Sequence, residues 1–189
     1  VIVKDIKRMS GPMVLKKGKQ YQIDMHLKHN RSKGIAVNKI PMKKASELFG
    51  ILNIVFFSPE DLNIIKNGPS ERRHFLDAEL CQLDKIYLSD LSNYNKILNQ
   101  RNKLLKDMVY RPELSDTLPV WDMQLIDTGK KIIRRREQFV KELNEIVHEI
   151  HYRISGGKEE LFLSYEPSVS ADMMEQEIER IRQRDLKMC

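Results

Sequence analysis

Two long stretches of this sequence carry apolar side chains at helical spacing, and only a short polar link separates them. The first stretch runs from residue 85 to about residue 110, and the second from residue 120 to residue 154. The link, residues 111–119, contains two prolines and is short enough to fold the pair into an antiparallel hairpin. At ~1.5 Å per residue the second helix would be roughly 50 Å long, so we expect an arm that projects from a head. The apolar positions are Leu88, Leu91, Ile97, Leu98, Leu104 and Leu105 in the first stretch, and Leu125, Ile132, Ile133, Phe139, Leu143, Ile146, Val147 and Ile150 in the second.

Residues 1–58 have a different pattern, in which apolar and polar side chains alternate. This period of two is typical of half-buried strands, as at Tyr21 and Ile23. A polar turn at 29–34 and a tight turn at Asn38-Lys39 favour a β-meander. We further expect a short helix over residues 45–51 and a strand buried on both faces over the apolar run 53–57.

The organisation changes at residues 58–61, where Ser-Pro-Glu-Asp is typical of a helix start. Ser70 is expected to cap a second helix, over residues 70–83. After the arm, two glycines end the second long helix. Residues 160–165 then have a strand pattern, and residues 170–187 have the pattern of an amphipathic helix.

These elements together predict an α+β fold that is predominantly helical. We expect a β-rich part at residues 1–58 and a helical arm, or lid domain, with a long antiparallel hairpin at residues 59–189. The first residue is Val1, and the chain stops directly after its last expected helix. We therefore expect a piece of a longer protein.

The composition narrows the class of partner only slightly. There are 33 lysines and arginines against 27 acidic residues, a net charge of +6, which suits a phosphate-bearing partner but also many solvated helical proteins. The two cysteines cannot form a disulfide framework, and Cys81 is expected to pack as a small apolar side chain. No stretch approaches about 18 apolar residues, so we expect a cytoplasmic protein.

Enzymatic motifs are missing from the sequence. No glycine-rich loop ends in lysine and precedes a helix, and no apolar strand ends in paired carboxylates that could hold magnesium. His148 and His151 share a helix face without enough further ligands for zinc, and Asp122 and Asp127 are expected to be solvated. We expect no metal, no cofactor and no nucleotide hydrolysis from this chain alone.

Two basic clusters are candidates for contact with DNA phosphates. Arg72 and Arg73 lie near a helix start, where they either bind phosphate or pair with acidic neighbours such as Glu71 to fix the arm on the head. The second cluster, the basic band, is either a DNA contact or a solvated helix face. It consists of Lys130, Lys131, Arg134, Arg135 and Arg136.

Residues 57–77, FSPEDLNIIKNGPSERRHFLD, resemble the signature of the RecF family. In that signature Pro-Glu-Asp precedes apolar residues, a Gly-Pro turn, two arginines, an aromatic residue, an apolar residue and Asp. Asn67 stands where the family usually has glycine, which is tolerable because asparagine enters the left-handed region readily. Asn38-Lys39 replaces an expected Asn-Gly turn. The matching residues are Pro59, Glu60, Asp61, Gly68, Pro69, Ser70, Glu71, Arg72, Arg73, Phe75, Leu76 and Asp77.

The resemblance implies an ABC-type ATPase of the SMC and Rad50 kind, which forms a homodimer around ATP and magnesium and binds duplex or gapped DNA. Such proteins work with RecO and RecR to place RecA on gapped DNA in recombinational repair, replication restart and the SOS response. The phosphate-binding loop would precede Val1, and the signature and magnesium-binding strand would follow Cys189. Residues 1–58 would then be a small part of the ATPase head, and Glu60 and Asp61 would lie near the nucleotide. The alternative is a structural arm that docks RecR without touching DNA.

Overall fold

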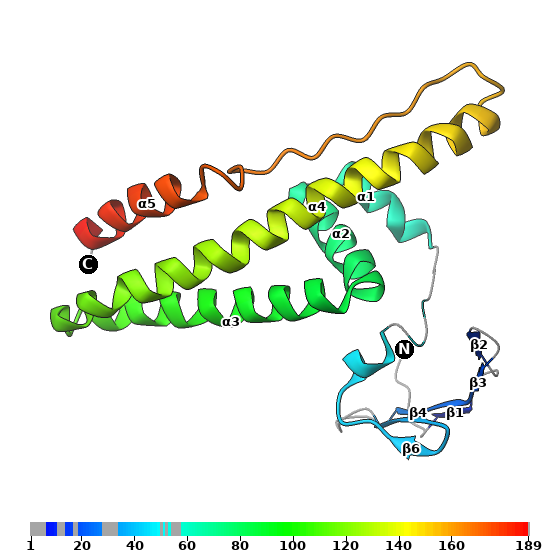
Figure 1. The fold of residues 1–189 in the computed structure, drawn as a ribbon, viewed down its shortest axis with the longest axis horizontal. Coiled ribbons are helices and arrows are strands. Elements are labelled where there is room, and N and C mark those ends of the chain that lie inside the picture. Colours follow the sequence, from blue (N-terminus) through cyan, green and yellow to red (C-terminus); the bar gives the residue numbers. More distant parts are fainter. Residues whose placement is uncertain are drawn as a thin grey trace. The chain divides into compact units, whose positions relative to one another are not determined.

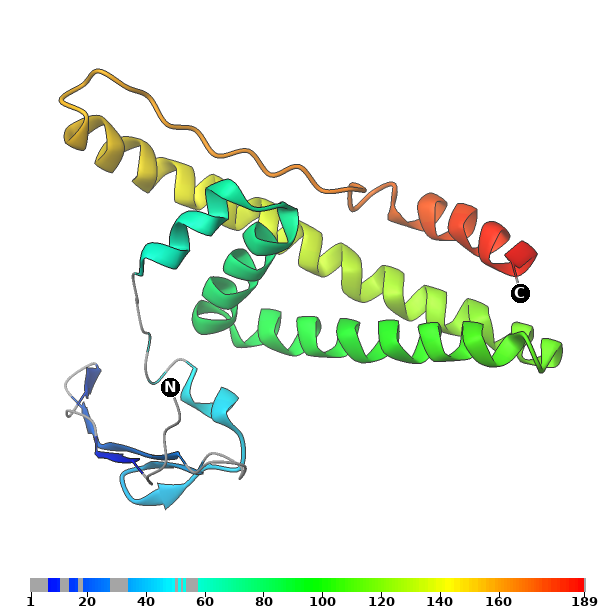
Figure 2. The ribbon, with the colours of Figure 1, turned by 180° about the vertical axis from the view of Figure 1, so that it is seen from behind.

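A computed structural model describes residues 7–10, 14–16, 19–27, 34–49, 51, 53 and 58–188. By its internal contacts the chain divides into two compact units, Val1–Lys85 and Ile86–Cys189. Figures 1 and 2 show the elements of both units. Residues 29–33 of the expected polar turn and residues 54–57 of the expected buried strand lie outside the described residues. The domain boundary expected at residue 58, between the β-rich part of the head and the helical arm, stays a prediction.

The first unit contains an antiparallel sheet with the strand order β1-β4-β5-β6. These strands are β1 (Lys7–Ser10), β4 (Ile23–Leu27), β5 (Gly34–Val37) and β6 (Ile40–Pro41). A separate hairpin pairs β2 (Val14–Lys16) with β3 (Lys19–Tyr21). The alternation of apolar and polar residues in the sequence therefore does correspond to strands.

The core of this sheet is small and apolar. Ile23, Ile35 and Val37 are buried on one face together with Leu48 of the 3-10 helix Ala45–Leu48. The turn between β5 and β6 has positive φ at both central residues, 51° at Asn38 and 67° at Lys39. Two such angles in a two-residue hairpin loop match the twist of the flanking strands, so the tight turn is confirmed.

Three short helical elements complete the first unit: η2 (Pro59–Leu62), α1 (Asn63–Lys66) and α2 (Pro69–Leu83). The prediction that Ser70 caps α2 is wrong, because the helix begins one residue earlier, with Gly68 as its cap. Proline suits a first helical turn because its φ is already helical and it has no N–H to leave unbonded there.

The second unit is built on a long helical hairpin. Helix α3 (Lys85–Met108) and helix α4 (Leu118–Ile154) lie side by side in Figures 1 and 2, joined through the 3-10 turn η3 (Pro112–Thr117). Helix α5 (Met174–Met188) packs along α4. The predicted α+β, mainly helical fold with a long antiparallel hairpin is confirmed.

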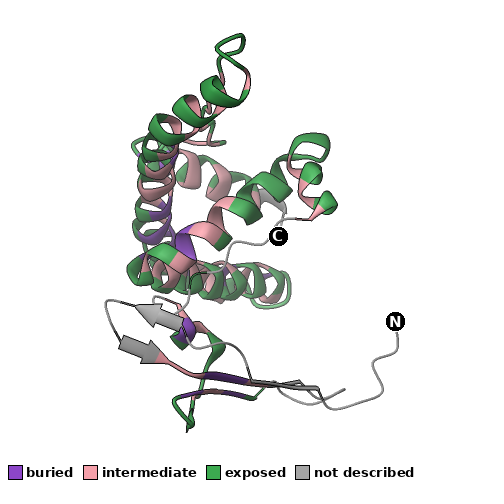
Figure 3. Ribbon diagram, turned by 90° about the vertical axis from the view of Figure 1, so that its right-hand side faces the viewer, coloured by how far each residue is buried: buried purple, intermediate pink, exposed green. Residues whose placement is uncertain are grey.

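The register of the hairpin follows a repeat of seven residues. On α3, Tyr87 and Arg101 lie two heptads apart, and on α4 their hydrogen-bond partners Arg136 and Asp122 lie the same distance apart in the opposite direction. Seven residues are close to two helical turns, so one face of each helix stays against the other. Buried apolar residues lie in both helices of the hairpin, and Figure 3 shows buried positions in patches among more exposed ones. They include Met108, Leu118, Leu125, Ile132 and Val140.

The expected strand at 160–165 is absent from this described part of the chain. An extended segment without regular structure follows α4 and runs back along it (Figure 1). The side-chain amide of Asn144 replaces a strand partner: its Nδ2 donates to the Leu163 carbonyl at 2.5 Å, and its Oδ1 accepts from the Leu163 N–H at 2.6 Å. The two glycines that end α4 have left-handed φ angles, 65° at Gly156 and 75° at Gly157, as is usual after a helix.

Within the described residues, no helix combines the length and the apolar character needed to cross a membrane.

Candidate nucleic-acid interface

The basic band on α4 does not form a single surface, because helical rotation spreads its five cations over several directions. Arg136 turns inward, where its Nε donates to the Tyr87 hydroxyl at 3.0 Å and ties α4 to α3. Arg135 lies 3.5 Å from Glu142 of the same helix, and its side chain is 29% exposed. These two arginines serve contacts within the arm.

Lys131 and Arg134 are the most accessible cations of the band, with side chains that are 53% and 65% exposed. Lys131 donates to Asp127 at 2.8 Å. This hydrogen bond and the charge of Asp127 raise the pKa of Lys131. Both residues project from the middle of a long helix, which gives them a fixed spacing.

Two cations of the band face the approach to α5. Lys130 Nζ lies 3.4 Å from Glu175, and Arg134 Nη2 lies 3.3 Å from Asp172. The acidic partners are distant from the band in sequence, so they cannot be found among the neighbouring charges of the sequence. Arg134 is therefore both exposed and paired.

Arg72 has a structural role within the first unit. Its Nη1 donates to the Ile64 carbonyl at 3.2 Å and to the Asn67 carbonyl at 3.0 Å, which holds the turn between α1 and α2. The expected partners were carboxylates such as Glu71, but the groups found are the carbonyls at the end of α1. Arg73 is exposed on α2.

Glu60 and Asp61 are engaged at the start of η2. The Ser58 N–H donates to Asp61 Oδ2 at 2.6 Å, which caps the helix. A hydrogen bond from the Ser58 side chain lowers the pKa of Glu60, with a second contribution from its own backbone. Both contacts are those of helix capping, so the placement near a nucleotide stays a prediction.

The described residues do not fit the phosphates of ATP. Among them, Gly156 and Gly157 follow a helix, and Gly68 precedes α2 but is followed by Pro69, which offers no N–H to a phosphate. No group of three or more metal-binding side chains gathers in this part of the structure. We therefore derive no catalytic step from it.

A buried charge network joins the three helices of the second unit, and the sequence interpretation missed it. Arg101 of α3 is 5% exposed and Asp122 of α4 is 2% exposed; Arg101 Nε donates to Asp122 Oδ1 at 2.6 Å. The expectation that Asp122 is solvated is thus wrong. Burial alone would lower the pKa of Arg101, but hydrogen bonds and charges from Asp122 and Asp185 outweigh it and raise the pKa.

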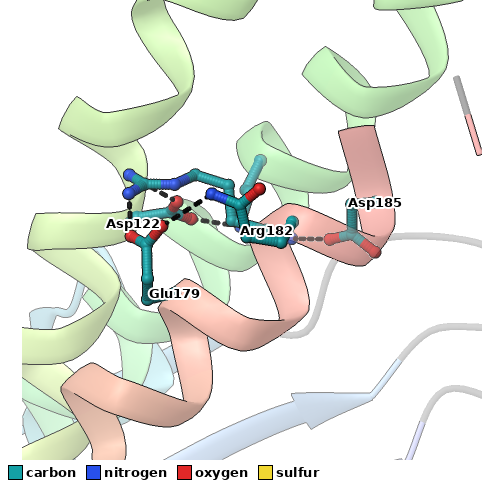
Figure 4. A network of polar contacts seen from close by, with 6 residues as sticks. Asp122, Glu179, Arg182 and Asp185 are labelled. Carbon is teal, nitrogen blue, oxygen red and sulfur yellow. Dashed lines mark hydrogen bonds and ion pairs between the residues drawn. The ribbon is translucent and has the colours of Figure 1, made fainter. Parts of the chain in front are cut away.

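Helix α5 closes this network (Figure 4). Arg101 Nη1 donates to Asp185 at 3.0 Å, and Arg182 lies 3.5 Å from the second oxygen of Asp122 and pairs with Glu179. A signal was present in the sequence, because Arg101 falls on the apolar seam of α3 between Leu98 and Leu104. A charge on a buried seam needs a partner, although its identity cannot be read locally.

The chain resembles known proteins over most of its length. The chain is 66% identical over 177 residues to the DNA replication and repair protein RecF of Agathobacter rectalis, which covers 94% of this chain and 49% of that protein. It is 61% identical to the RecF of Lachnospira eligens, with 92% of this chain and 48% of that protein covered. The chain therefore matches RecF proteins at high identity over about half of their length, as a fragment of such a protein would.

A solved structure of the recombination mediator protein RecF with ATP, from the RecFOR pathway, supports the same assignment. It matches with a TM-score of 0.75 and 32% identity, over 89% of this chain and 48% of that one. The chain thus spans about half the length of the RecF proteins that it matches. A scan against protein-family models found no match.

Proposed function

We propose that this chain is the arm-bearing part of a RecF-type protein of DNA replication and repair, and that the arm contacts DNA phosphates through Lys131 and Arg134. The observation that carries the proposal is the exposure of these two cations, 53% and 65%, on a long helix of a RecF-like fold. Phosphate contacts of this kind supply affinity and orientation without reading sequence.

The wider role proposed for the whole protein follows the RecF relatives. It would bind ATP and magnesium and form an ATP-dependent homodimer in the cytoplasm. It would act with RecO and RecR to load RecA at gaps, in recombinational repair, replication restart and the SOS response. The relatives, a DNA replication and repair protein and a RecF-ATP complex of the RecFOR pathway, support the role in repair and the binding of ATP. The arm would contribute DNA contact and dimer geometry, and no catalysis.

Charge reversal tests the DNA contact directly. Lys131→Glu with Arg134→Glu should weaken binding of the full chain to labelled duplex DNA by at least about tenfold at low salt, and should lower the slope of log affinity against log salt by about two. The reason is the loss of two phosphate contacts together with new repulsion.

The matched control is Arg153→Glu with Lys158→Glu, which makes the same change in net charge. Arg153 is a 76% exposed arginine near the C-terminal end of α4, paired with Glu149, and Lys158 is exposed just beyond that end. This variant should bind DNA nearly as the unchanged chain does. Equal affinity of the doubly reversed variant and the unchanged chain would remove the proposal.

The second candidate is a structural arm that docks RecR without touching DNA. The observation that favours it is an apolar stripe on the C-terminal half of α4, where Ile146, Ile150 and Ile154 are 58%, 51% and 79% exposed. Residues four apart lie on one helix face, so the three form a continuous row. A pull-down with RecR, compared with the DNA titration, separates the two candidates.

A further inference from the structure

An acidic turn lies against the basic band, at the beginning of α5. Asp172 approaches Arg134 at 3.3 Å, and Glu175 approaches Lys130 at 3.4 Å. The two acids are 88% and 73% exposed, so they reach the cations from the solvent side. A carboxylate at this distance from a guanidinium or an ammonium group occupies the position that a DNA phosphate oxygen would take.

The position of the acidic turn is set by its buried neighbours. Ala171 directly precedes Asp172, and Met174 directly precedes Glu175. Ala171 and Met174 are only 8% and 4% exposed. Met174 enters a space that exists because residue 129 is a glycine: a Cβ added there would lie 2.1 Å from Met174 Cε. The acids are thus held over the band by packing as well as by charge.

We propose that this acidic turn is a built-in competitor for DNA phosphate at Lys130 and Arg134. The inference rests on the proposed DNA contact at Arg134, extends that contact to the neighbouring Lys130, and adds its regulation: a bound duplex displaces Asp172 from Arg134 and Glu175 from Lys130. The turn favours tight binding only where the DNA supplies enough phosphates to displace both acids. The affinity for isolated phosphates is lowered, because they do not displace both acids.

The size of the effect follows from the exposure of the pairs. Ion pairs this accessible to water are individually weak and are screened by salt, so the turn lowers affinity without abolishing it. Removal of both acidic charges should strengthen DNA binding roughly twofold to tenfold at low salt. The salt dependence should also steepen by up to about two counter-ions, because both cations become available to phosphate.

The test uses Asp172→Asn with Glu175→Gln in the full chain, titrated with labelled duplex DNA across a salt series. The control is Glu113→Gln with Asp116→Asn, which makes the same change in net charge in η3, at the turn of the hairpin. A general charge effect would strengthen binding equally in both variants. A local competitor predicts a larger gain, and a steeper salt slope, for the variant at residues 172 and 175 only.

Each outcome decides one proposal. A gain no larger than that of the control overturns the competitor, while the DNA contact stands if the Lys131→Glu, Arg134→Glu variant still loses affinity. If that reversed variant binds as well as the unchanged chain, the DNA contact itself fails. Asn and Gln keep the shape of the acids, and both positions are exposed, so a folding defect is not expected to obscure the result.

Discussion

At the scale of single residues, the pair formed by Arg101 and Asp122 has the most consequence for the fold. Both side chains lie in the seam between α3 and α4, at 6% and 3% exposure, where the surrounding positions are apolar. Desolvation of two charges is costly, and good geometry only offsets it. The pair therefore contributes more to the register of α3 against α4 than to stability. Asp185 extends this effect on register to α5.

Arg101→Met should destabilise the second unit by about 3 kcal/mol, because Asp122 would remain buried with only the longer contact to Arg182. The free energy of unfolding can be measured in urea from the fluorescence of Trp121, the single tryptophan, which lies in α4. Adding Asp122→Leu should recover most of the loss. A cost below about 1 kcal/mol for Arg101→Met alone would show that the pair is not desolvated as described.

At the scale of elements, the hairpin could be predicted because each helix carries its own apolar repeat and the link is too short for any other arrangement. The tight turn at Asn38-Lys39 was likewise a local feature. The strand expected at 160–165 was wrong because alternation shows only that a segment is extended and faces a surface. Here the surface is a helix, and Asn144 supplies the two hydrogen bonds that a neighbouring strand would have made.

Asn144→Ala should release the extended segment while α4 stays intact. Removing two hydrogen bonds of roughly 1 kcal/mol each should speed hydrogen exchange at the Leu163 amide by about tenfold or more. Asn102→Ala, a change at an exposed asparagine of α3, is the control and should leave that amide unaffected. Unchanged exchange at Leu163 in the Asn144 variant would contradict the contact.

At the scale of the whole molecule, the candidate site could be predicted only in part. The basic residues of α4 were visible in the sequence, because charge is a local property. Which of them turn inward, as Arg136 does, depends on the register of the hairpin. Which of them are covered, as Lys130 is by Glu175, depends on a helix that lies 45 residues further along the chain. Long-range packing therefore decides the surface that a partner meets.

The most direct test of the account is a lysine footprint of the full chain with saturating duplex DNA. Acetylation of Lys131 should be slowed strongly by the DNA, because the proposed contact places this exposed amine against phosphate. Acetylation of Lys158, which is exposed just beyond the end of α4, should not change. Equal modification of Lys131 with and without bound DNA would contradict the claim that the middle of α4 is the DNA contact.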